Sequence, residues 1–291
     1  MINEEYLTTA VCPTQRWKFG RQHWRVDRDE GFRKSDFAVD IVPDSVAKRF
    51  VTEHHYSGSY PAAVERVGLF HGSHLVGVAV YSIPMNNAAI PKYTGCDPSA
   101  GLELGRFVLL DHVPYNAESW FSAASRKLLK EVRPAVKAVI AYSDPMPRVT
   151  ESGRSIMPGH VGICYQAGGA AYLGRSAART LHLTRDGLVV SPRSISKIRL
   201  QEQGAAGAEK NLVRLGATPR AFGQDPADWV ASVLASDTFI RVRHPGNHTY
   251  AWSLGRTREK RKLEKSFAAA KPYPKQLDPV QHGLDLFAAD A

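Results

Sequence analysis

Residues 52–60 read TEHHYSGSY and place three side chains with useful chemistry next to one another. His54, His55 and Tyr56 can each move a proton or bind a metal. The stretch follows DSVAKRFV, an amphipathic helix for which Asp44 is the predicted N-cap. Two interpretations are open. His55 acts as a base or metal ligand with Tyr56 as an acid or hydrogen-bond donor, or His54 packs inward and the next two residues only end the helix.

One arginine interrupts an otherwise apolar strand, LELGRFVLLD, at residues 102–111. Strict alternation places Arg106 on one strand face with four apolar residues: Leu102, Leu104, Val108 and Leu110. A buried guanidinium needs a counter-charge or an anionic ligand. Arg106 therefore either forms a structural ion pair with Glu103 or Asp111, or it contacts an anionic ligand or acts in catalysis.

Polar residues also follow the predicted ends of two neighbouring strands. Asn116 is a candidate N-cap for the helix AESWFSAASRKLLKEV, and Ser119 lies in its first turn, where free N–H groups favour an anion. Asp144 follows the strand AVKAVIAY. Because open sheets hold ligands at the carboxyl ends of parallel strands, we expect Asp144 and the helix start to converge. Capping alone also explains Asn116, and aspartate before proline is common in turns.

A sheet must position these residues, and the hydrophobic pattern predicts one. Apolar runs predict strands at residues 36–42, 64–70, 74–83, 102–111 and 135–142, the second and third forming a hairpin. Turn formers predict a loop at 84–101. A buried strand, a helix and a second buried strand form a parallel crossover, so the sheet is mixed. The predicted fold class is α/β, with the element order of the GCN5-related N-acetyltransferase fold.

The later part of the chain contains shorter predicted elements and more basic residues. After a polar loop come a short helix in HVGICYQAGG, the strand AYLG and a hairpin of RTLHLT with LVVS. Three short helices follow Ser191, then two strands, FIRVRHP and HTYAWSLG, and a basic helical run. The predicted divisions are an N-terminal extension (1–35), a catalytic core (36–190), a basic helical insertion (191–238), closing strands of the core (239–257) and a basic, partly flexible tail (258–291).

The composition indicates an anionic partner. Lys and Arg number 38 against 28 Asp and Glu, which gives a net charge of +10 and favours nucleic acid first and an anionic membrane surface second. The three cysteines are widely spaced, which is typical of a reducing cytosol and argues against structural zinc. No stretch approaches the roughly 20 apolar residues of a membrane span, so we expect a cytoplasmic protein.

Five motifs together carry a family resemblance. HHYSGSYP, ELGRFVLLD followed by NAES, AYSDP, GHVGICYQAGGAAYLG and RHPGNHTYAWSLG resemble the Mom family of phage DNA-modification proteins over residues 36–190 and 240–275. The resemblance implies an acetyltransferase-like fold with a helical insertion and a basic tail. It also implies transfer of a carbamoylmethyl (acetamido) group to the N6 amine of adenine in DNA, in a bacterial host.

The resemblance assigns roles residue by residue. The implied catalytic residues are His55, Tyr56, Arg106, Ser119 and Asp144. The residues implied to bind the donor are Phe107, Val108, Asn116, Ser119 and Tyr165. An acyl-CoA such as acetyl-CoA is the implied donor, and iron is a candidate metal at His55 and Tyr56. One departure is the turn HVPYNAES, which lacks the glycines that hold the pyrophosphate of coenzyme A in this fold.

DNA is the expected partner. Basic residues on the insertion and the tail are predicted to hold its phosphates: Arg193, Lys197, Arg199, Arg258, Arg261 and Lys262. Tyr165, Tyr172 and Tyr250 are candidates to stack on a flipped base. Two other functions are open: an acetyl-CoA-dependent N-acetyltransferase for a peptide or small-molecule amine, and a non-catalytic DNA-binding protein.

Overall fold

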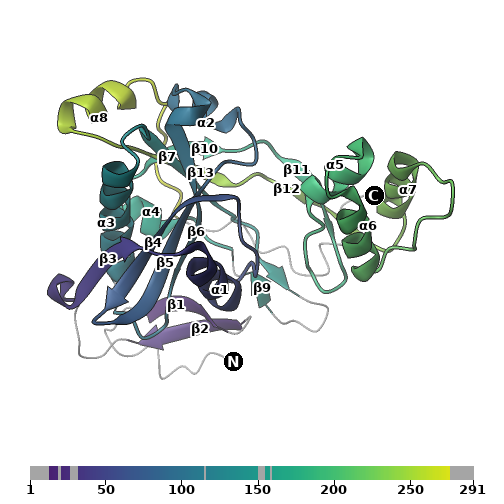
Figure 1. The fold of residues 1–291 in the computed structure, drawn as a ribbon, viewed down its shortest axis with the longest axis horizontal. Coiled ribbons are helices and arrows are strands. Elements are labelled where there is room, and N and C mark those ends of the chain that lie inside the picture. The colour runs from purple at the N-terminus through teal and green to yellow at the C-terminus, as the bar shows by residue number, and fades with distance from the viewer. Residues whose placement is uncertain are drawn as a thin grey trace. The chain divides into compact units, whose positions relative to one another are not determined.

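The computed structural model describes residues 13–18, 21–26, 32–114, 116–149, 155–157 and 159–275. These residues form two compact units (Figure 1). The core unit contains the described residues up to 145, together with 160–176 and 247–275. The second unit contains the described residues of 146–159, together with 177–246.

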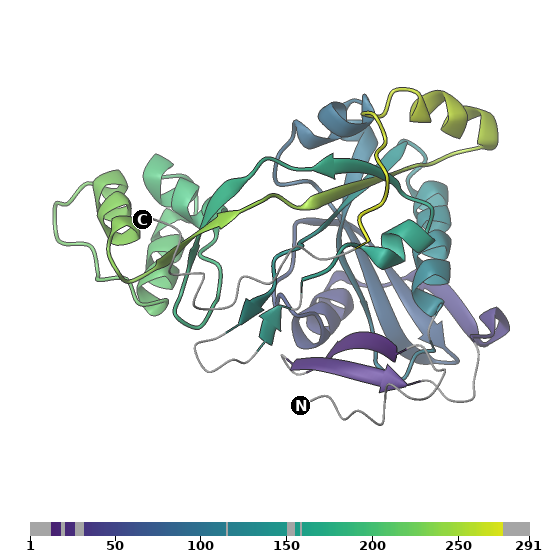
Figure 2. The same cartoon turned by 180° about the vertical axis from the view of Figure 1, so that it is seen from behind.

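A seven-stranded mixed sheet forms the core unit, in the order β10-β13-β7-β6-β5-β4-β3 (Figures 1 and 2). Its strands, in chain order, are β3 Phe37–Ile41, β4 Ala63–His71, β5 His74–Ser82, β6 Gly101–Leu109, β7 Ala138–Ser143, β10 Ala171–Arg175 and β13 His248–Ser253. Only β6 and β7 pair in parallel, and helix α3, Ala117–Val132, connects them. The predicted α/β fold, with a mixed sheet, a hairpin and a parallel crossover, is confirmed.

Helices cover both faces of this sheet. On one face, α3 and α4 (Ile163–Ala167) bury Phe121, Leu129 and Tyr165 against the sheet. On the other face, α1 (Asp44–His54) buries Ala47 and Val51 against β5 and β6, and α2 (Ala89–Thr94) packs on β7. Because strand side chains alternate, the strands other than edge strand β3 contribute to the cores on both faces.

Some local predictions are wrong. The predicted loop 84–101 contains α2 and a 3-10 turn, Pro98–Ala100. The prolines and asparagines of this segment predict a loop, but burial of Ile90 and Tyr93 stabilises the helix. Asp44 is the first residue of α1 rather than its cap, and it accepts a hydrogen bond from Tyr60 Oη (3.0 Å). Asn116 has a left-handed backbone, with φ 71°, and its side chain makes no capping hydrogen bond.

The second unit has its own core. The three predicted helices are present as α5 Pro192–Leu200, α6 Ala205–Arg214 and α7 Pro226–Ala235, and they bury Ile198, Leu212 and Trp229 together. Strand β11, Arg179–Leu183, pairs with β12, Ile240–His244. The predicted hairpin of RTLHLT with LVVS is present but short: Leu183 bridges Val189, Thr184 N–H donates to Leu188 O (2.9 Å), and Val190 N–H donates to His182 O (2.8 Å). The sequence did not predict that β12 is the main partner of β11. A two-stranded sheet also pairs β8 Arg148–Val149 with β9 Ser155–Met157.

Only β13 returns to the core sheet, so β12 groups with the helices rather than with the predicted closing strands. The backbone N–H of Ser176 donates to Asn247 O (2.8 Å), which places the two ends of the inserted segment 177–246 next to each other.

At the two ends of the chain, the structure describes only part of what the sequence predicts. The basic helical run is α8, Thr257–Glu264, and strands β1 Pro13–Lys18 and β2 Arg21–Val26 pair within the predicted extension. Residues 1–12, with Cys12, and 276–291 lie outside the described residues. No helix in the described part is long and apolar enough to cross a membrane.

Candidate active site

A bulge in β6 determines which side chains of this strand lie on the same face of the sheet. The pairing of β6 with β5 skips Gly105, so Leu104 and Arg106 lie opposite consecutive residues of β5. Such a bulge resets the alternation of side chains and often redirects one beside an active site. Arg106 therefore shares the α1 face of the sheet with Glu103, while Leu104 lies in the core beneath α3. The prediction that Arg106 shares a face with Leu102 and Leu104 is wrong.

Gly105 is required at the bulge because there is no room for a side chain. A Cβ atom there would lie 2.4 Å from Ser82 Oγ and 3.3 Å from Pro61 Cγ. The packing around Gly105 thus keeps β6 in the register that brings Glu103 and Arg106 to one face.

Arg106 anchors the segment that follows α1. Its Nε donates to Ser59 O (2.9 Å) and its Nη2 donates to Ser59 Oγ (2.7 Å). Arg106 forms no ion pair within the described residues, so the alternative of a pair with Glu103 or Asp111 is not what the structure shows. Burial lowers the pKa of Arg106, and nearby Tyr56 and Glu103 oppose that shift.

His55 is held as a neutral ring. Its Nδ1 accepts a hydrogen bond from the Ser57 backbone N–H (3.1 Å), so the ring proton is on Nε2. Burial, and then the positive charges of Arg106 and His160, lower the pKa of His55 to about 3. At neutral pH His55 is thus a hydrogen-bond donor rather than a base.

The residues on either side of His55, His54 and Tyr56, make different ring contacts. The Tyr56 ring lies 4.2 Å from the His55 ring, centroid to centroid. His54 packs edge-on against Phe50 (4.7 Å), as the inward-packing interpretation predicts for that residue. The two adjacent histidines therefore have different surroundings.

Glu103 lies where the central strands separate. The parallel pairing of β6 with β7 ends at Glu103 and Ile140. Burial raises the pKa of Glu103 to about 7, although Arg106 opposes the shift. Its carboxylate makes no hydrogen bond or ion pair within the described residues. A carboxylate that titrates near neutral pH beside a cation is suited to act as a general base.

The sequence predicts Glu103 only as a possible counter-ion of Arg106 and not as a base, because the bulge that brings the two residues to one face has no local signal.

A second set of residues completes the cluster from the α4 side. The His160 backbone N–H donates to Asp144 O (2.8 Å). Burial lowers the pKa of His160 to about 4, against the opposing charge of Asp144. Buried Tyr165 interacts with Tyr56, Glu103 and Arg106, and its burial raises its pKa well above the ordinary value. The structure thus brings together five predicted residues: His55, Tyr56, Arg106, Asp144 and Tyr165.

Comparison with known proteins identifies the family. The sequence model of the Mom protein family matches residues 36–225. The chain belongs to the Mom family. The methylcarbamoylase mom of Escherichia phage Mu is 25% identical over 146 residues, which are 50% of this Mom-family chain and 56% of that protein. The chain therefore matches little more than half the length of this relative.

Structure comparison aligns the chain with two solved structures. One is a Bacillus subtilis acetyltransferase in complex with CoA, with 6% identity, a TM-score of 0.31, and coverage of 75% of this chain and 99% of that one. The other is a tandem GNAT protein from the clavulanic acid biosynthesis pathway without AcCoA, with 9% identity, a TM-score of 0.39, and coverage of 76% and 99%.

Other predicted residues of this Mom-family chain lie apart from the cluster. Ser119 Oγ donates to Asn116 O (3.0 Å) at the start of α3. Phe107 stacks on Phe121 (5.3 Å) on the α3 face, while Val108 is buried on the α1 face. Because these two side chains pack in the core, they would reach a donor only through their backbone. Their roles, like those of Asn116 and Ser119, stay predictions.

None of the three predicted stacking tyrosines fits that role, since Tyr165 is itself buried in the sheet core and the other two are also hydrogen-bonded there. Tyr172 Oη is 2.8 Å from His248 Nδ1, and Tyr250 Oη donates to Val161 O. Both rings are buried in the sheet core. Neither ring presents a face to a base.

The surroundings of His55 and Tyr56 do not fit the predicted iron site. The described residues contain no group of three or more His, Cys, Asp or Glu side chains that could hold a metal ion. Arg106 is the group whose positive charge acts most strongly on His55, and a guanidinium repels a metal cation.

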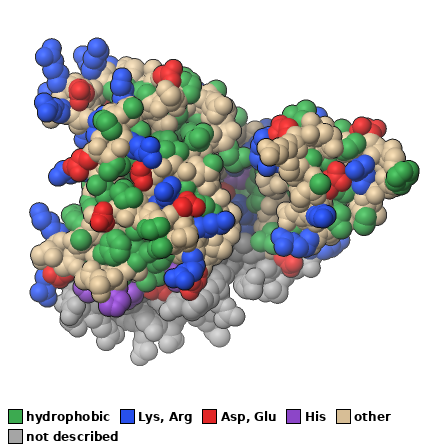
Figure 3. Space-filling view, viewed as in Figure 1, with side chains coloured by type: hydrophobic (Ala, Val, Ile, Leu, Met, Phe, Trp, Pro, Cys, Tyr) green, Lys and Arg blue, Asp and Glu red, His purple; other side chains and the backbone are tan. Residues whose placement is uncertain are grey.

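The predicted DNA-binding residues lie on α5 and α8. Arg258, Arg261 and Lys262 are exposed on α8, over which Figure 3 shows a concentration of Lys and Arg. On α5, Arg193 already forms an ion pair with Glu202. Lys197 and Arg199 form no ion pair within the described residues.

Proposed function

We propose that this chain is a transferase that modifies adenine in DNA at its exocyclic N6 amine with an acyl-derived group, such as carbamoylmethyl (acetamido). One observation carries the proposal: the Mom-family match includes the whole cluster around Glu103 and Arg106, where β6 and β7 separate. The phage Mu relative is named a methylcarbamoylase, which agrees with transfer of such a group.

The cluster offers the groups this reaction needs. The lone pair of the adenine amine is delocalised into the ring, so a base must take the N6 proton as N6 bonds to the incoming carbon. Glu103, with a pKa of about 7, is suited to accept that proton. Arg106, the Nε2–H of His55 and the Tyr56 hydroxyl are positioned to stabilise negative charge on an oxygen of the donor.

An acyl-CoA is the proposed donor, and it would supply an activated carbonyl carbon. The β6–β7 pairing ends at Glu103, so residues 104–109 of β6 do not pair with β7. Their backbone N–H and C=O groups on the β7 side could hydrogen-bond an extended ligand. This fits the extended part of an acyl-CoA. Attack of N6 on that carbonyl carbon breaks the thioester bond, releases the CoA thiolate and gives an N6-acyl adenine. A carbamoylmethyl group is bonded to N6 through its methylene carbon and carries an amide nitrogen, so that product needs a donor activated at the methylene carbon and a nitrogen source.

The cluster contains Arg106, two histidines that are neutral at neutral pH, and two carboxylates, Asp144 and Glu103, of which Glu103 is half protonated near neutral pH. The charge of the cluster therefore does not separate an adenine amine from a peptide amine. The net charge of +10 on the whole chain is what favours DNA. In duplex DNA the target base must leave the stack. Basic side chains on α5 and α8 would hold the phosphates while it does so.

Mass spectrometry of nucleosides from cells that express the chain tests the proposal. We expect a deoxyadenosine made heavier by the transferred group, lost in His55→Ala and Arg106→Ala. His54→Ala is the matched control, because His54 packs on Phe50 and should leave modification intact. Unmodified nucleosides with a folded wild-type chain would contradict the proposal. DNA binding without modification would favour the non-catalytic function, and acetylated peptide amines would favour the N-acetyltransferase.

A further inference from the structure

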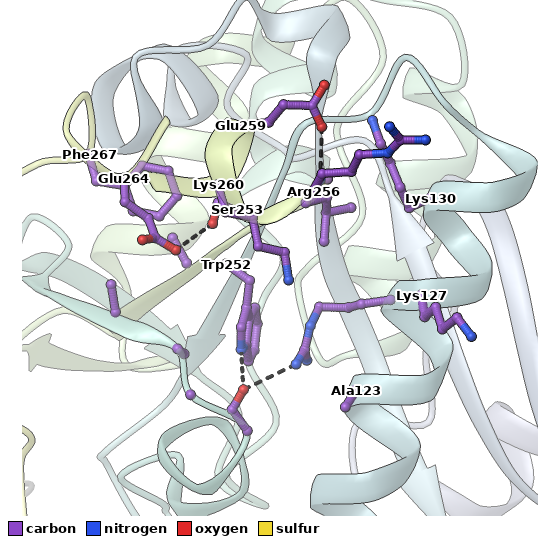
Figure 4. Close-up of a pocket in the computed structure, with 18 of the residues that line it drawn as sticks. Ala123, Lys127, Lys130, Trp252, Ser253, Arg256, Glu259, Lys260, Glu264 and Phe267 are labelled. Atoms are coloured by element: carbon purple, nitrogen blue, oxygen red, sulfur yellow. Dashed lines mark hydrogen bonds between the residues drawn. The ribbon is translucent and has the colours of Figure 1, made fainter. Parts of the chain in front are cut away.

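The core unit contains a large, half-open cavity beside α3, and neither Glu103 nor Arg106 is among its lining residues. α3, the residues after α4, the end of β13 and the α8 region line about 1010 Å³ (Figure 4). Trp252 lines the cavity and belongs to the same core cluster as Leu104 and Phe121. None of the residues that line the cavity belongs to the cluster around Glu103 and Arg106, although Trp252 packs edge-on against Tyr165 of that cluster (5.6 Å).

Positive charge dominates the walls of this cavity. Five cations line it, and none forms an ion pair within the described residues: Arg126, Lys127, Lys130, Arg256 and Lys260. Of its three carboxylates, Glu259 accepts from the Arg256 backbone N–H (2.8 Å) and Glu264 accepts from Ser253 Oγ (2.6 Å). In Figure 4, Arg256 extends toward α3, where Lys127 and Lys130 lie. The walls thus carry an excess of cations that no carboxylate neutralises.

Arg126 distinguishes this cavity from an ordinary solvated surface. Its side chain is only 8% exposed, yet it has no carboxylate partner within the described residues. Its Nη1 donates to Ser122 Oγ (2.5 Å), its Nη2 donates to Gly168 O (3.1 Å), and its guanidinium lies 4.3 Å from the Trp252 ring centre. Burying an arginine without a counter-charge is costly. An anion in the cavity would provide that counter-charge.

The geometry around Arg126 is fixed in advance. Trp252 Nε1 donates to the same carbonyl, Gly168 O (2.9 Å), so the indole and the guanidinium are held by one backbone oxygen. The volume lies at the upper end of small-molecule pockets, which measure roughly 300–1,000 Å³. Phe267 and Tyr273 add apolar lining. A ligand with anionic groups and an apolar part would match these walls.

We infer that this cavity is a second ligand site, which binds a small molecule that bears phosphate groups. Several cations at the walls and one guanidinium at depth suit phosphate oxygens. A DNA duplex would contact the exposed lysines but could not reach the buried Arg126. The inference depends on this cavity alone and does not require the proposed function.

Calorimetric titration of the full chain with inorganic pyrophosphate tests the inference. The cavity variant is Arg256→Gln/Lys260→Gln, which changes two exposed residues and spares the buried Arg126. The matched control is Arg261→Gln/Lys262→Gln, which removes the same charge from α8 at positions that do not line the cavity. We expect wild type and control to bind pyrophosphate alike, and the cavity variant to bind at least about tenfold more weakly.

Three outcomes would overturn the inference. They are no binding by the wild type, equal weakening in both variants, and displacement of pyrophosphate by a short DNA duplex. Displacement by coenzyme A together with loss of DNA modification in the cavity variant would assign the cavity to the transferase site, and the inference of a second site would fail. Retained DNA modification with weakened pyrophosphate binding supports it.

Discussion

Glu103 and His55 show how one cluster can hold two titratable groups in different states at neutral pH. Both are shifted by burial, but in opposite directions: the pKa of the carboxyl rises to about 7 and that of the imidazole falls to about 3. The group that titrates near neutral pH is therefore the glutamate. A pH–rate profile should have a limb near pH 7 from Glu103 and none at the ordinary histidine value.

Replacing Glu103 should separate activity from stability. Its raised pKa means that ionising it destabilises the fold, with stability falling as pH rises from about 4.5 to 7. We expect Glu103→Gln to lower the modification rate by roughly a hundredfold or more and to flatten the limb near pH 7. The melting temperature of the same variant should exceed that of wild type at pH 8 and equal it at pH 4. A normal rate with an unchanged pH profile would exclude Glu103 as the base.

At the scale of elements, the bulge in β6 determines the position of the segment after α1. Gly105 sets the register, Arg106 then reaches Ser59, and this contact positions His55 at the end of α1. Two segments far apart in the sequence thus depend on a single residue without a side chain.

Gly105→Ala should disturb both stability and activity. Its Cβ would lie 2.4 Å from Ser82 Oγ, and we expect a loss of about 1–3 kcal/mol in the free energy of unfolding, with lower modification. Ser82→Ala removes the clashing oxygen, so the double variant should recover part of both losses. Urea unfolding and nucleoside analysis measure the two effects. A single variant that unfolds and reacts like wild type would show that the bulge tolerates a side chain.

The sequence predicted the helices and strands better than the strand register and the contacts between distant segments. The hairpin β4–β5 and the crossover through α3 follow from apolar runs and turn residues, which are local signals. The bulge shifts register by one residue, and alternation counted along one strand cannot detect it. Likewise, the difference between His54 and His55 depends on Phe50, Arg106 and Ser57, which the fold brings together. The raised pKa of Glu103 is a consequence of burial and has no local signature.

At the scale of the whole molecule, the excess charge is spread over both units. The core unit presents exposed cations on α8, and the second unit presents them on α5, where one of the three is already neutralised by Glu202. Sequence-independent phosphate contacts need only such cations.

Charge reversal on α8 should weaken DNA binding without changing which base is modified. We expect Arg258→Glu, Arg261→Glu and Lys262→Glu together to lower affinity and to reduce the salt slope by roughly 0.9 for each lost contact. Arg193→Ala should have a smaller effect than Lys197→Ala, because the guanidinium of Arg193 is paired. Binding measured across a salt titration checks both. An unchanged slope in the triple variant would show that α8 is only a solvated helix.

The insertion of residues 177–246 between β10 and β13 bears on how the sheet closes. The entropic cost of joining two chain segments grows with the logarithm of the flexible length between them. Pairing of β11 with β12 brings Arg179 opposite His244, so a folded second unit leaves only a few free residues on each side. During synthesis this unit emerges before β13, and its early folding shortens the loop that the last strand of the core must close.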